Sequence, residues 1–217
     1  MEFHPKSEAE LAEVVAGLQA PVRVQGGGTR AVGSVVANDV LHLDGIAGVV
    51  DYEPGALTLV AKAGTPLCEI EATLAAEKQR LSFEPMDHRV LLGTKGEPTI
   101  GGVVAANVSG PRRISVGACR DFALGVRFVD GMGRVVKNGG RVMKNVTGYD
   151  LVKLMAGSRG TLGAMSEVSL KVMPVPEVEA TMALHVADAA QAVEAMSVAL
   201  GSPYEVTGAA QSGAVRR

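Results

Sequence analysis

Hydrophobic and polar positions follow a helical period at the start of the chain. Apolar residues recur at helical spacing at Leu11, Val14, Val15 and Leu18. They follow Ser7 and Glu10, whose spacing is that of a capping box. The pattern therefore predicts an amphipathic helix that begins after Ser7 and packs one face on a core.

Two further groups of segments follow. The first group reads as three short strands and a helix with proline in its first turn, over 22–24, 40–43, 57–63 and 66–77. Glycine, proline and lysine then interrupt the periodicity over 93–98. The second group reads as a helix, two strands around a turn at Asp130-Gly131, a short helix and a strand, over 101–108, 123–129, 134–136, 151–155 and 165–172. The pattern predicts an α+β domain of two α/β lobes, 1–97 and 98–174.

The chain changes character after Pro174 and Pro176. A strand-like stretch over 181–186, a helix over 188–200 and a loop from Gly201 follow. About 40 residues are too few for an independent core. We therefore expect 175–217 to be the beginning of an incomplete second α+β domain, with apolar surface left exposed near 181–200.

Composition narrows the function classes. Apolar residues make up 47% and charged residues 20% of the chain, and the net charge is −2, so neither charge-driven disorder nor nucleic-acid binding is indicated. The two cysteines and four histidines show no metal-ligand spacing, so we expect no metal site and two reduced, buried cysteines. No stretch approaches the roughly 18 apolar residues of a membrane span. This predicts a cytoplasmic location, or a peripheral one at the inner membrane through partners.

The first candidate site is a strand that runs into a glycine loop at Gly26, Gly27, Gly28 and Thr29. Bare backbone N–H groups there can form an anion-binding nest for a pyrophosphate, and Thr29 can add a hydroxyl donor. An ordinary turn between strands is the alternative.

A nicotinamide-binding interpretation of the same loop is possible but disfavoured. Gly26, Gly28 and Ala31 match the dinucleotide fingerprint, and Asp44 lies near the position of a ribose-binding acid. However, the stretch from 30 to 39 is short for a crossover helix between parallel strands and is rich in poor helix formers. The loop is expected to join strands directly.

Two later segments repeat the glycine theme. Thr99, Gly101 and Gly102 open an apolar helix, where an anion or a flavin ring could approach the N-terminus; close helix packing through the small residues is the alternative. Further on, a KNVTGYDL stretch (144–151) precedes glycines 157, 160 and 163, which suggest a loop pressed against something flat, or three turns.

The order of these motifs resembles a known family. GGGT, TIGG with SG behind it, KNVTGYDL, and GSRGTLG ahead of EVSLKV together resemble the FAD-binding domain of the vanillyl-alcohol-oxidase and p-cresol-methylhydroxylase (PCMH) superfamily, over about residues 1–174. The strings SGPRR (109–113), RDF (120–122) and VMKN (142–145) are similar to the E-subunit family of bacterial glycolate oxidases, as is the tail over 202–210.

The resemblance implies a PCMH-type fold with FAD as cofactor. It implies that the loop 26–29 holds the pyrophosphate, that Thr99, Gly101 and Gly102 face the flavin or ribityl chain, and that Ser109, Gly110 and Gly163 complete the channel. Members that tether FAD covalently use a His, Tyr or Cys, and no His lies near the loop in sequence, so non-covalent FAD is expected. Asp121 is a further candidate, either bonding the flavin or pairing structurally. Four basic residues could steer an anion or simply be solvated: Arg112, Arg113, Lys144 and Arg159.

The implied activity is oxidation of glycolate, a small 2-hydroxy acid, to glyoxylate with electron transfer through the flavin. The implied partners are a sibling FAD-linked glycolate oxidase subunit and an iron–sulfur subunit. No catalytic residue can be named. A non-catalytic, FAD-stabilised structural subunit is the alternative, and the 217-residue chain by itself is expected to bind FAD with little or no activity.

Overall fold

A computed structural model describes residues 1–33, 37–141 and 148–212. Its helices are α1 (Glu8–Gly17), α2 (Leu67–Ala76), α3 (Arg89–Leu92), α4 (Ile100–Ala105), α5 (Arg113–Val116), α6 (Cys119–Phe122), α7 (Leu151–Met155) and α8 (Ala189–Leu200), with a 3-10 turn at Pro54–Ala56. Its strands are β1 (Glu2–Phe3), β2 (Val22–Gln25), β3 (Asp39–His42), β4 (Val49–Glu53), β5 (Thr58–Lys62), β6 (Gln79–Arg80), β7 (Ala123–Val129), β8 (Val135–Gly139), β9 (Ala164–Lys171) and β10 (Met173–Pro174). The predicted α+β class is confirmed.

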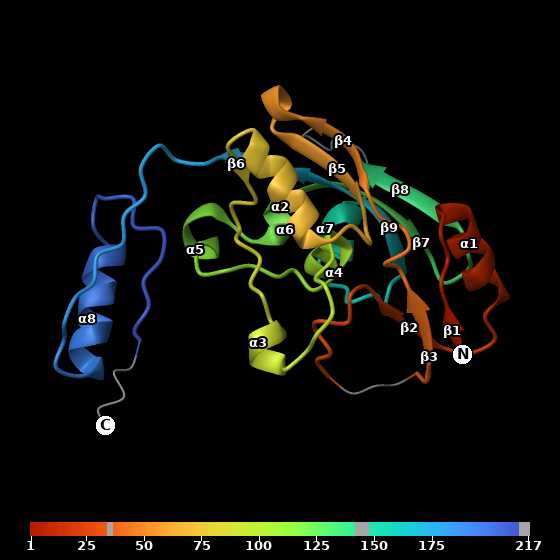
Figure 1. Ribbon diagram of the computed structural model, residues 1–217, viewed down its shortest axis with the longest axis horizontal. Helices are drawn as coiled ribbons and strands as arrows, with labels where there is room; N and C mark the ends of the chain where they lie inside the picture. The colour runs from red at the N-terminus through yellow and green to blue at the C-terminus, as the bar shows by residue number, and fades with distance from the viewer. Residues whose placement is uncertain (34–36, 142–147, 213–217) are drawn as a thin grey trace.

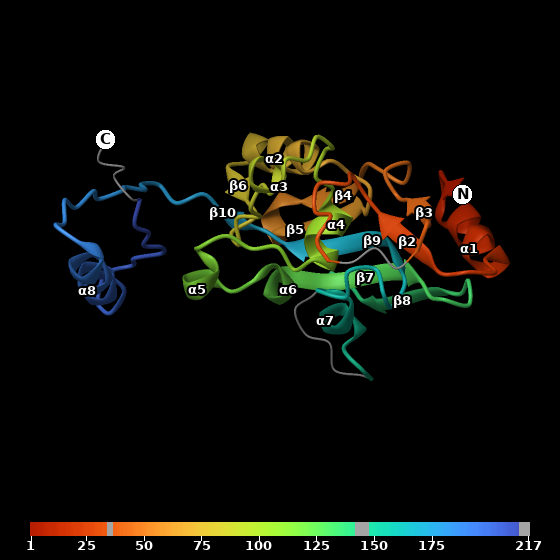
Figure 2. The same cartoon turned by 90° about the horizontal axis from the view of Figure 1, so that it is seen from below.

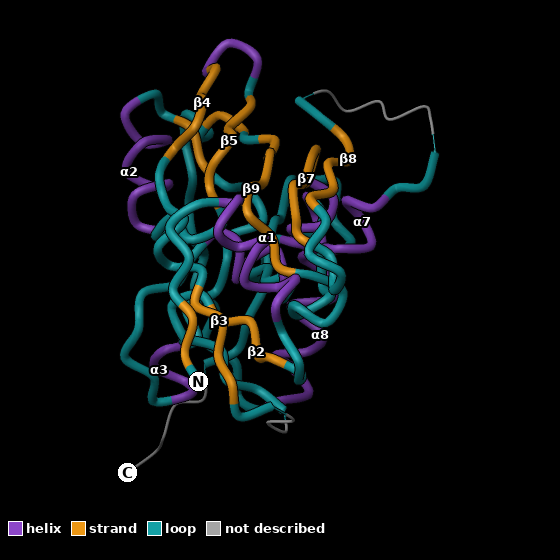
Figure 3. Tube along the Cα trace, turned by 90° about the vertical axis from the view of Figure 1, so that its right-hand side faces the viewer, coloured by secondary structure: helices purple, strands orange, loops and turns teal. Residues whose placement is uncertain are grey.

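The smaller of the two main sheets has three parallel strands in the order β1-β3-β2, at the lower end of the molecule in Figure 3. Leu41 on β3 and Leu11 on α1 are fully buried in one apolar cluster, so the predicted amphipathic helix covers this sheet. The prediction that the loop joins strands without a crossover helix is confirmed over its described part, but the argument that the connection is short for parallel strands was wrong. Residues 26–38 join β2 to parallel β3, and their described part forms a loop without a helix.

The larger sheet has five antiparallel strands in the order β4-β5-β9-β7-β8 (Figures 1 and 3). Helices α2, α4 and α7 pack on one face of it, since Ile70 of α2, Val103 of α4 and Val152 of α7 belong to one buried cluster. Figure 2 shows α2 near β4 and β5, and α7 near β7 and β8. Fully buried side chains from α2, the following loop and the strands fill the main core, among them Ile70, Phe83 and Leu170. This sheet contains β4 and β5, which precede residue 97, and β7, β8 and β9, which follow it. The larger sheet therefore includes strands from both sides of the boundary predicted between the two lobes.

Most predicted elements agree with the structure. Strand β7 and helix α7 have the predicted bounds, whereas α4 is shorter than expected and begins at Ile100, with Thr99 as its N-cap. Strands β1, β4, β6 and β10 and the short helices α3, α5 and α6 were not predicted. Each is brief or lies at an edge, where burial supplies little periodicity.

The C-terminal segment agrees only in part. Helix α8 forms, with Asp188 as N-cap, and lies apart from both sheets in Figure 1. The strand predicted over 181–186 is wrong: this stretch is extended but has no hydrogen-bonded neighbour among the described strands. A β-strand needs such a neighbour to satisfy its backbone. The segment also leaves Met182 and Leu184 exposed.

Two further features bear on the expectations from composition. Cys119 is buried as expected, but Cys68 is exposed, because it lies on the solvent side of α2 opposite Ile70 and Leu74; both thiols are free. Within the described residues, every helix is too short or too polar to cross a membrane.

Candidate cofactor site

The glycine loop after β2 is held against the segment that precedes α4. A Cβ atom added to Gly27 would lie 1.6 Å from the carbonyl oxygen of Glu97, and one added to Gly26 would lie 2.3 Å from Oγ1 of Thr99. Gly28 has a φ of +68°, a left-handed backbone conformation that glycine adopts more easily than other residues. The first two glycines are therefore required by close packing, and this packing joins two motifs that are about seventy residues apart in sequence.

The two glycines at the start of α4 differ in their surroundings. A Cβ on Gly101 would meet Cβ of Ala63 at 2.6 Å, so this glycine packs against β5. A Cβ on Gly102 would meet only Oγ1 of Thr99 at 3.2 Å and Nη1 of Arg30 at 3.9 Å. Thr99 caps the helix by accepting a hydrogen bond from the Gly102 N–H. Gly102 thus borders space that a ligand can enter, and Gly101 does not.

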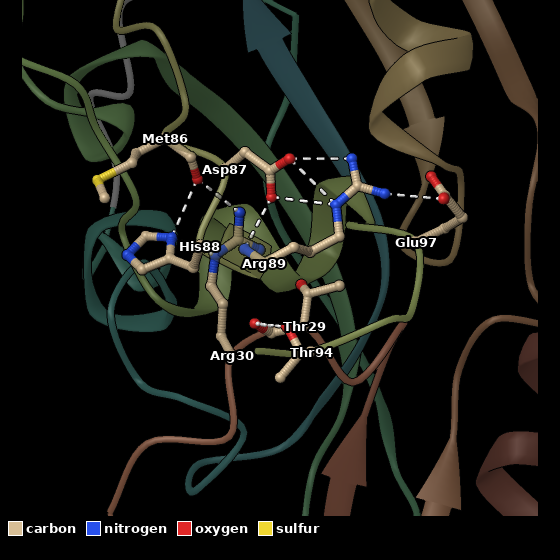
Figure 4. Close-up of polar contacts among 8 residues, drawn as sticks. All are labelled: Thr29, Arg30, Met86, Asp87, His88, Arg89, Thr94 and Glu97. Carbon is tan, nitrogen blue, oxygen red and sulfur yellow. Dashed lines mark hydrogen bonds and ion pairs between the residues drawn. The ribbon is translucent and has the colours of Figure 1, made fainter. Parts of the chain in front are cut away.

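Arg30, directly after the loop, extends toward His88 (Figure 4), and its Nη1 lies 3.9 Å from the position of a Cβ on Gly102. Its Nε donates to Nδ1 of His88 at 3.2 Å and its Nη2 donates to the carbonyl oxygen of Met86 at 3.3 Å. Within the described part of the chain Nη1 donates to no acceptor and no carboxylate forms an ion pair with the guanidinium. Burial lowers the pKa of Arg30, opposed by the nearby charge of Asp87. A half-buried cation without a bonded anion is what an anionic ligand would complement.

Ion pairs connect residues within the segment 86–97, and a hydrogen bond from Thr94 joins this segment to the glycine loop (Figure 4). The Arg89 guanidinium bonds Asp87 at 2.9 Å and Glu97 at 2.9 Å, and the Thr94 hydroxyl donates to the carbonyl oxygen of Thr29 at 3.0 Å. The bonds from Arg89 hold the pKa of Asp87 below its ordinary value. Because these groups are paired with one another, they leave Arg30 as the cation that faces the site.

A second group of predicted residues adjoins Arg30. Ser109 accepts a hydrogen bond from the Cys119 N–H at 2.9 Å, and Asp121 caps α6 by accepting from the Ala118 N–H at 2.8 Å. Gly110 packs against the carbonyl oxygen of Glu84. These bonds give Ser109 and Asp121 structural roles, and Asp121 pairs with backbone rather than with Arg120.

Cys119 connects the two groups electrostatically. Its thiol lies close enough to Arg30 for each to influence the ionisation of the other. Burial raises the pKa of the Cys119 thiol to about 12, so the group stays protonated at neutral pH and is no nucleophile.

The third glycine segment returns to the same place. The Gly157 N–H donates to the carbonyl oxygen of Val104 and the Arg159 N–H to that of Ala105, so the loop packs on the end of α4. Gly160 lies against Val24 of β2, where an added Cβ would be 3.0 Å away. Gly163 instead lies at the start of β9 against Val129, with a φ of +152°, and no described contact joins it to the glycine loop.

Among the basic candidates, Arg112 is paired with Glu179 and Glu84 and Arg113 is exposed, so neither faces the glycine loop. The predicted Lys144, and the KNVTGYDL motif up to residue 147, lie outside the described residues. A groove of about 860 Å³ between α2, β6 and 175–177 contains none of the predicted site residues.

Sequence reasoning missed Arg30, His88 and the 86–97 segment. The position of Arg30 directly after a glycine loop could have indicated that this residue binds an anion. Which residues would surround its guanidinium could not be inferred, because His88 is 58 residues away. The structure places the glycine loop and the start of α4 beside a half-buried cation, Arg30, which suits an anionic ligand such as a dinucleotide pyrophosphate.

Comparisons with known proteins agree with this geometry. Residues 1–139 match the model of an FAD binding domain. The chain is 43% identical to glycolate oxidase subunit GlcE of Escherichia coli over 157 residues, 72% of this chain and 43% of that protein. It is 31% identical to glycolate oxidase subunit GlcD of Bacillus subtilis over 67% of this chain and 27% of that protein. It therefore spans less than half the length of these relatives.

A solved structure supports the fold. An alkyldihydroxyacetonephosphate synthase superposes with a TM-score of 0.64 over 80% of this chain and 31% of that one, at 24% identity. The predicted PCMH-type fold and the resemblance to glycolate oxidase E subunits are both confirmed. The chain belongs to the family of FAD-binding domains, and its cofactor is FAD.

Proposed function

We propose that the chain binds FAD non-covalently, with the pyrophosphate at Gly26 to Thr29 and Arg30. In this proposal the N–H groups of the loop and the guanidinium of Arg30 hold the phosphates, and Gly102 leaves room for the rest of the cofactor beside Thr99. The observation that carries it is that the glycine loop and the start of α4 meet beside one half-buried cation, Arg30, which forms no ion pair within the described chain.

The remaining predicted residues take supporting roles in this proposal. Gly101, Ser109 and Gly110 set the shape of the wall by packing and hydrogen bonding, and Asp121 holds the turn that carries Cys119. Gly163 shapes the end of β9. His88 lies beside Arg30, and its Nδ1 accepts a hydrogen bond from that guanidinium, so this nitrogen is not available for a covalent bond to the flavin.

We further propose that the protein serves as an FAD-binding subunit of a glycolate (2-hydroxy-acid) oxidase complex. The 43% identity to glycolate oxidase subunit GlcE supports this role, together with the weaker identity to GlcD. The partners would be a sibling FAD-linked subunit and an iron–sulfur subunit. When bound, the flavin would accept the electrons removed from the hydroxy acid; the residues of this chain bind and orient it and exclude water from it.

The domain division belongs to the same proposal. Residues 1–174 would form the FAD-binding domain and 175–217 the beginning of a second, substrate-side domain. The ion pairs of Glu179 with Arg80 and Arg112 support a fixed exit for this second segment.

Acid precipitation tests the cofactor proposal. Protein purified with excess FAD should be yellow, and precipitation with acid should release the flavin to the supernatant. Flavin that stays with the precipitate would show covalent attachment, and protein that takes up no flavin would contradict the assigned site.

A different experiment separates a catalytic subunit from an FAD-stabilised structural one. The protein would be co-purified with its partners, and the reduction of a dye by glycolate would be measured for the wild type and for Gly102→Val. Catalytic participation predicts that activity falls with the FAD content of this subunit. Unchanged activity in a complex that has lost this FAD would favour the structural role.

A further inference from the structure

Two parallel strands bring together three side chains that carry metal-ligand atoms. Strand β1 pairs with β3 in the register Glu2 to Val40 and Phe3 to Leu41, so the next residues along, His4 and His42, are neighbours. Glu2 and His4 are two residues apart in extended chain and therefore project from the same face. The two histidines are 38 residues apart in sequence, and for this reason their spacing gave no sign of a metal site.

The three ligand atoms lie close to one another. A carboxylate oxygen of Glu2 is 3.7 Å from Nε2 of His4 and 3.8 Å from Nε2 of His42. The imidazole rings are stacked, with centroids 4.3 Å apart and an angle of 9° between their planes. All three ligand atoms fall within 4.8 Å of each other.

The state of His42 points to a ligand at this place. Its Nε2 is buried, and no hydrogen-bond partner is present in the part of the chain that the structure describes. The Glu2 oxygen at 3.8 Å is beyond hydrogen-bond distance. A buried nitrogen left without a partner is destabilising, because it has lost its hydrogen bond to water. A cation between His42 and Glu2 would satisfy both the lone pair and the carboxylate.

We propose that Glu2, His4 and His42 bind a divalent transition-metal ion, with Zn²⁺ as the best match. Two imidazole nitrogens and one carboxylate oxygen suit Zn²⁺, whereas Mg²⁺ and Ca²⁺ prefer sets made only of oxygen. Ligand atoms about 2.0–2.1 Å from a tetrahedral Zn²⁺ are about 3.3 Å from one another. The two distances from Glu2 to the imidazole nitrogens therefore need to shorten by about half an ångström, and the rings need to turn so that both lone pairs meet at the ion.

The position of the site suggests its effect. The ion would cross-link the first strand of the chain to β3, and β3 pairs on its other side with β2, where Gln25 lies beside His42. Gln25 directly precedes the glycine loop. The site would thus stabilise the sheet that carries this loop, while its three ligands remain separate from the residues that bind FAD in our proposal.

Calorimetric titration with Zn²⁺ is the primary test. The chain would carry a histidine-free tag at its C-terminus, because an N-terminal tag would disturb Glu2, and it would be stripped with a chelator. One site with a micromolar dissociation constant is expected. In NMR spectra of the imidazole nitrogens, Zn²⁺ should shift two of the four histidines. Binding weaker than about 1 mM, or shifts that exclude His4 and His42, would overturn the proposal.

Matched variants identify the ligands. His42→Ala and Glu2→Gln should each weaken Zn²⁺ binding more than about tenfold. Glu2 is largely exposed, so Glu2→Gln tests the site without risk to folding. His185→Ala, in the exposed C-terminal segment, is the control and should bind Zn²⁺ as the wild type does. Equal affinity in Glu2→Gln and the wild type, or loss of binding in His185→Ala, would show that the ion binds elsewhere.

Thermal unfolding gives a second readout. Zn²⁺ should raise the melting temperature of the wild type, because it binds only the folded arrangement, and should leave that of His42→Ala unchanged. A rise of equal size in both would mean that these strands are not cross-linked by the ion and that the histidines form an ordinary surface pair with Glu2.

Discussion

The core of the five-stranded sheet and the surroundings of the glycine loop are packed by different kinds of contact. The five-stranded sheet and its covering helices are filled with large apolar side chains, such as the fully buried Leu59, Ile70 and Phe83. Around the glycine loop, backbone packs on backbone instead: Gly27 lies against Glu97, and Gly96 lies equally close to Gly27. The first arrangement supplies hydrophobic stabilisation, and the second supplies bare N–H groups and room. Substitutions on the two sides should therefore affect different properties.

The largest effect on stability should come from the apolar side. Phe83 is fully buried and packs against Phe122 with ring centroids 5.5 Å apart. Phe83→Ala should lower the free energy of unfolding by about 3–5 kcal/mol, through lost burial and the cavity left behind. Chemical denaturation measures this. If the two regions act separately, the folded fraction of Phe83→Ala should bind FAD with nearly the affinity of the wild type.

Val90 provides the control for that prediction. Its side chain is 94% exposed on α3, and Val90→Ala should change stability by no more than about 0.5 kcal/mol. A loss for Phe83→Ala as small as this would mean that the cluster around the five-stranded sheet is not the main source of stability.

On the glycine side, the next largest effect should be on cofactor affinity. Gly102→Val places a side chain in the space beside Thr99 and Arg30 and should weaken FAD binding at least about tenfold, equivalent to about 1.4 kcal/mol. Gly55→Val adds the same bulk where no atom lies within 4 Å and should bind FAD as the wild type does. Flavin fluorescence titration at matched stability compares them. Equal affinities would assign Gly102 to packing alone.

Arg30 should make a smaller contribution to the same affinity. Arg30→Gln removes the cation while keeping a donor, and we expect FAD affinity to fall about threefold to tenfold, because a neutral hydrogen bond to the phosphate replaces a stronger, charge-assisted one. Added salt should weaken FAD binding to the wild type more than to Arg30→Gln. The control is Arg23→Gln, an exposed arginine on β2. If both variants lose affinity equally, general charge rather than the position of Arg30 is responsible.

The same contrast explains what the sequence could predict. Helix α1, strand β7 and helix α7 follow from apolar periodicity and capping residues, which are local signals. The fold and the cofactor were predicted from the resemblance of the ordered glycine motifs to a known family. Close packing explains two of these glycines, because Gly26 and Gly27 have no room for a side chain. Position along the chain does not reveal what each glycine meets: Gly101 packs against Ala63, while Gly102 lies beside the side chains of Thr99 and Arg30.

Long-range pairs were likewise beyond sequence reasoning. Arg30 meets His88, and His4 meets His42, only after parallel strands and a loop have been placed in space. The strand predicted over 181–186 failed for the related reason that a strand depends on a neighbour elsewhere in the chain. The periodicity of apolar residues predicts which face of a helix or strand is buried, but not which other segment of the chain packs against that face.

The smallest predicted effect concerns the contact between the two sheets. Glu8 on α1 bonds Arg127 of β7, with N–O distance 2.9 Å to Nε, and the hydroxyl of Ser166 on β9. The bond from Arg127, helped by Ser166 and opposed by burial, lowers the pKa of Glu8 below its ordinary value of 4.5. A carboxyl with a lowered pKa stabilises the fold above its unfolded pKa, and this stability is lost as the pH falls through the folded pKa.

Glu8→Gln should therefore be about 1 kcal/mol or less destabilising at pH 7. The difference from the wild type should shrink once the pH falls below 4.5, where Glu8 takes up a proton and resembles glutamine. Denaturation at a series of pH values measures this, with Glu13→Gln on the exposed face of α1 as the control. A difference that stays constant from pH 7 to acid pH would show that the contact acts through packing and not through the charge of Glu8. In that case α1 would be attached to the five-stranded sheet by packing, as the residues of the apolar core are.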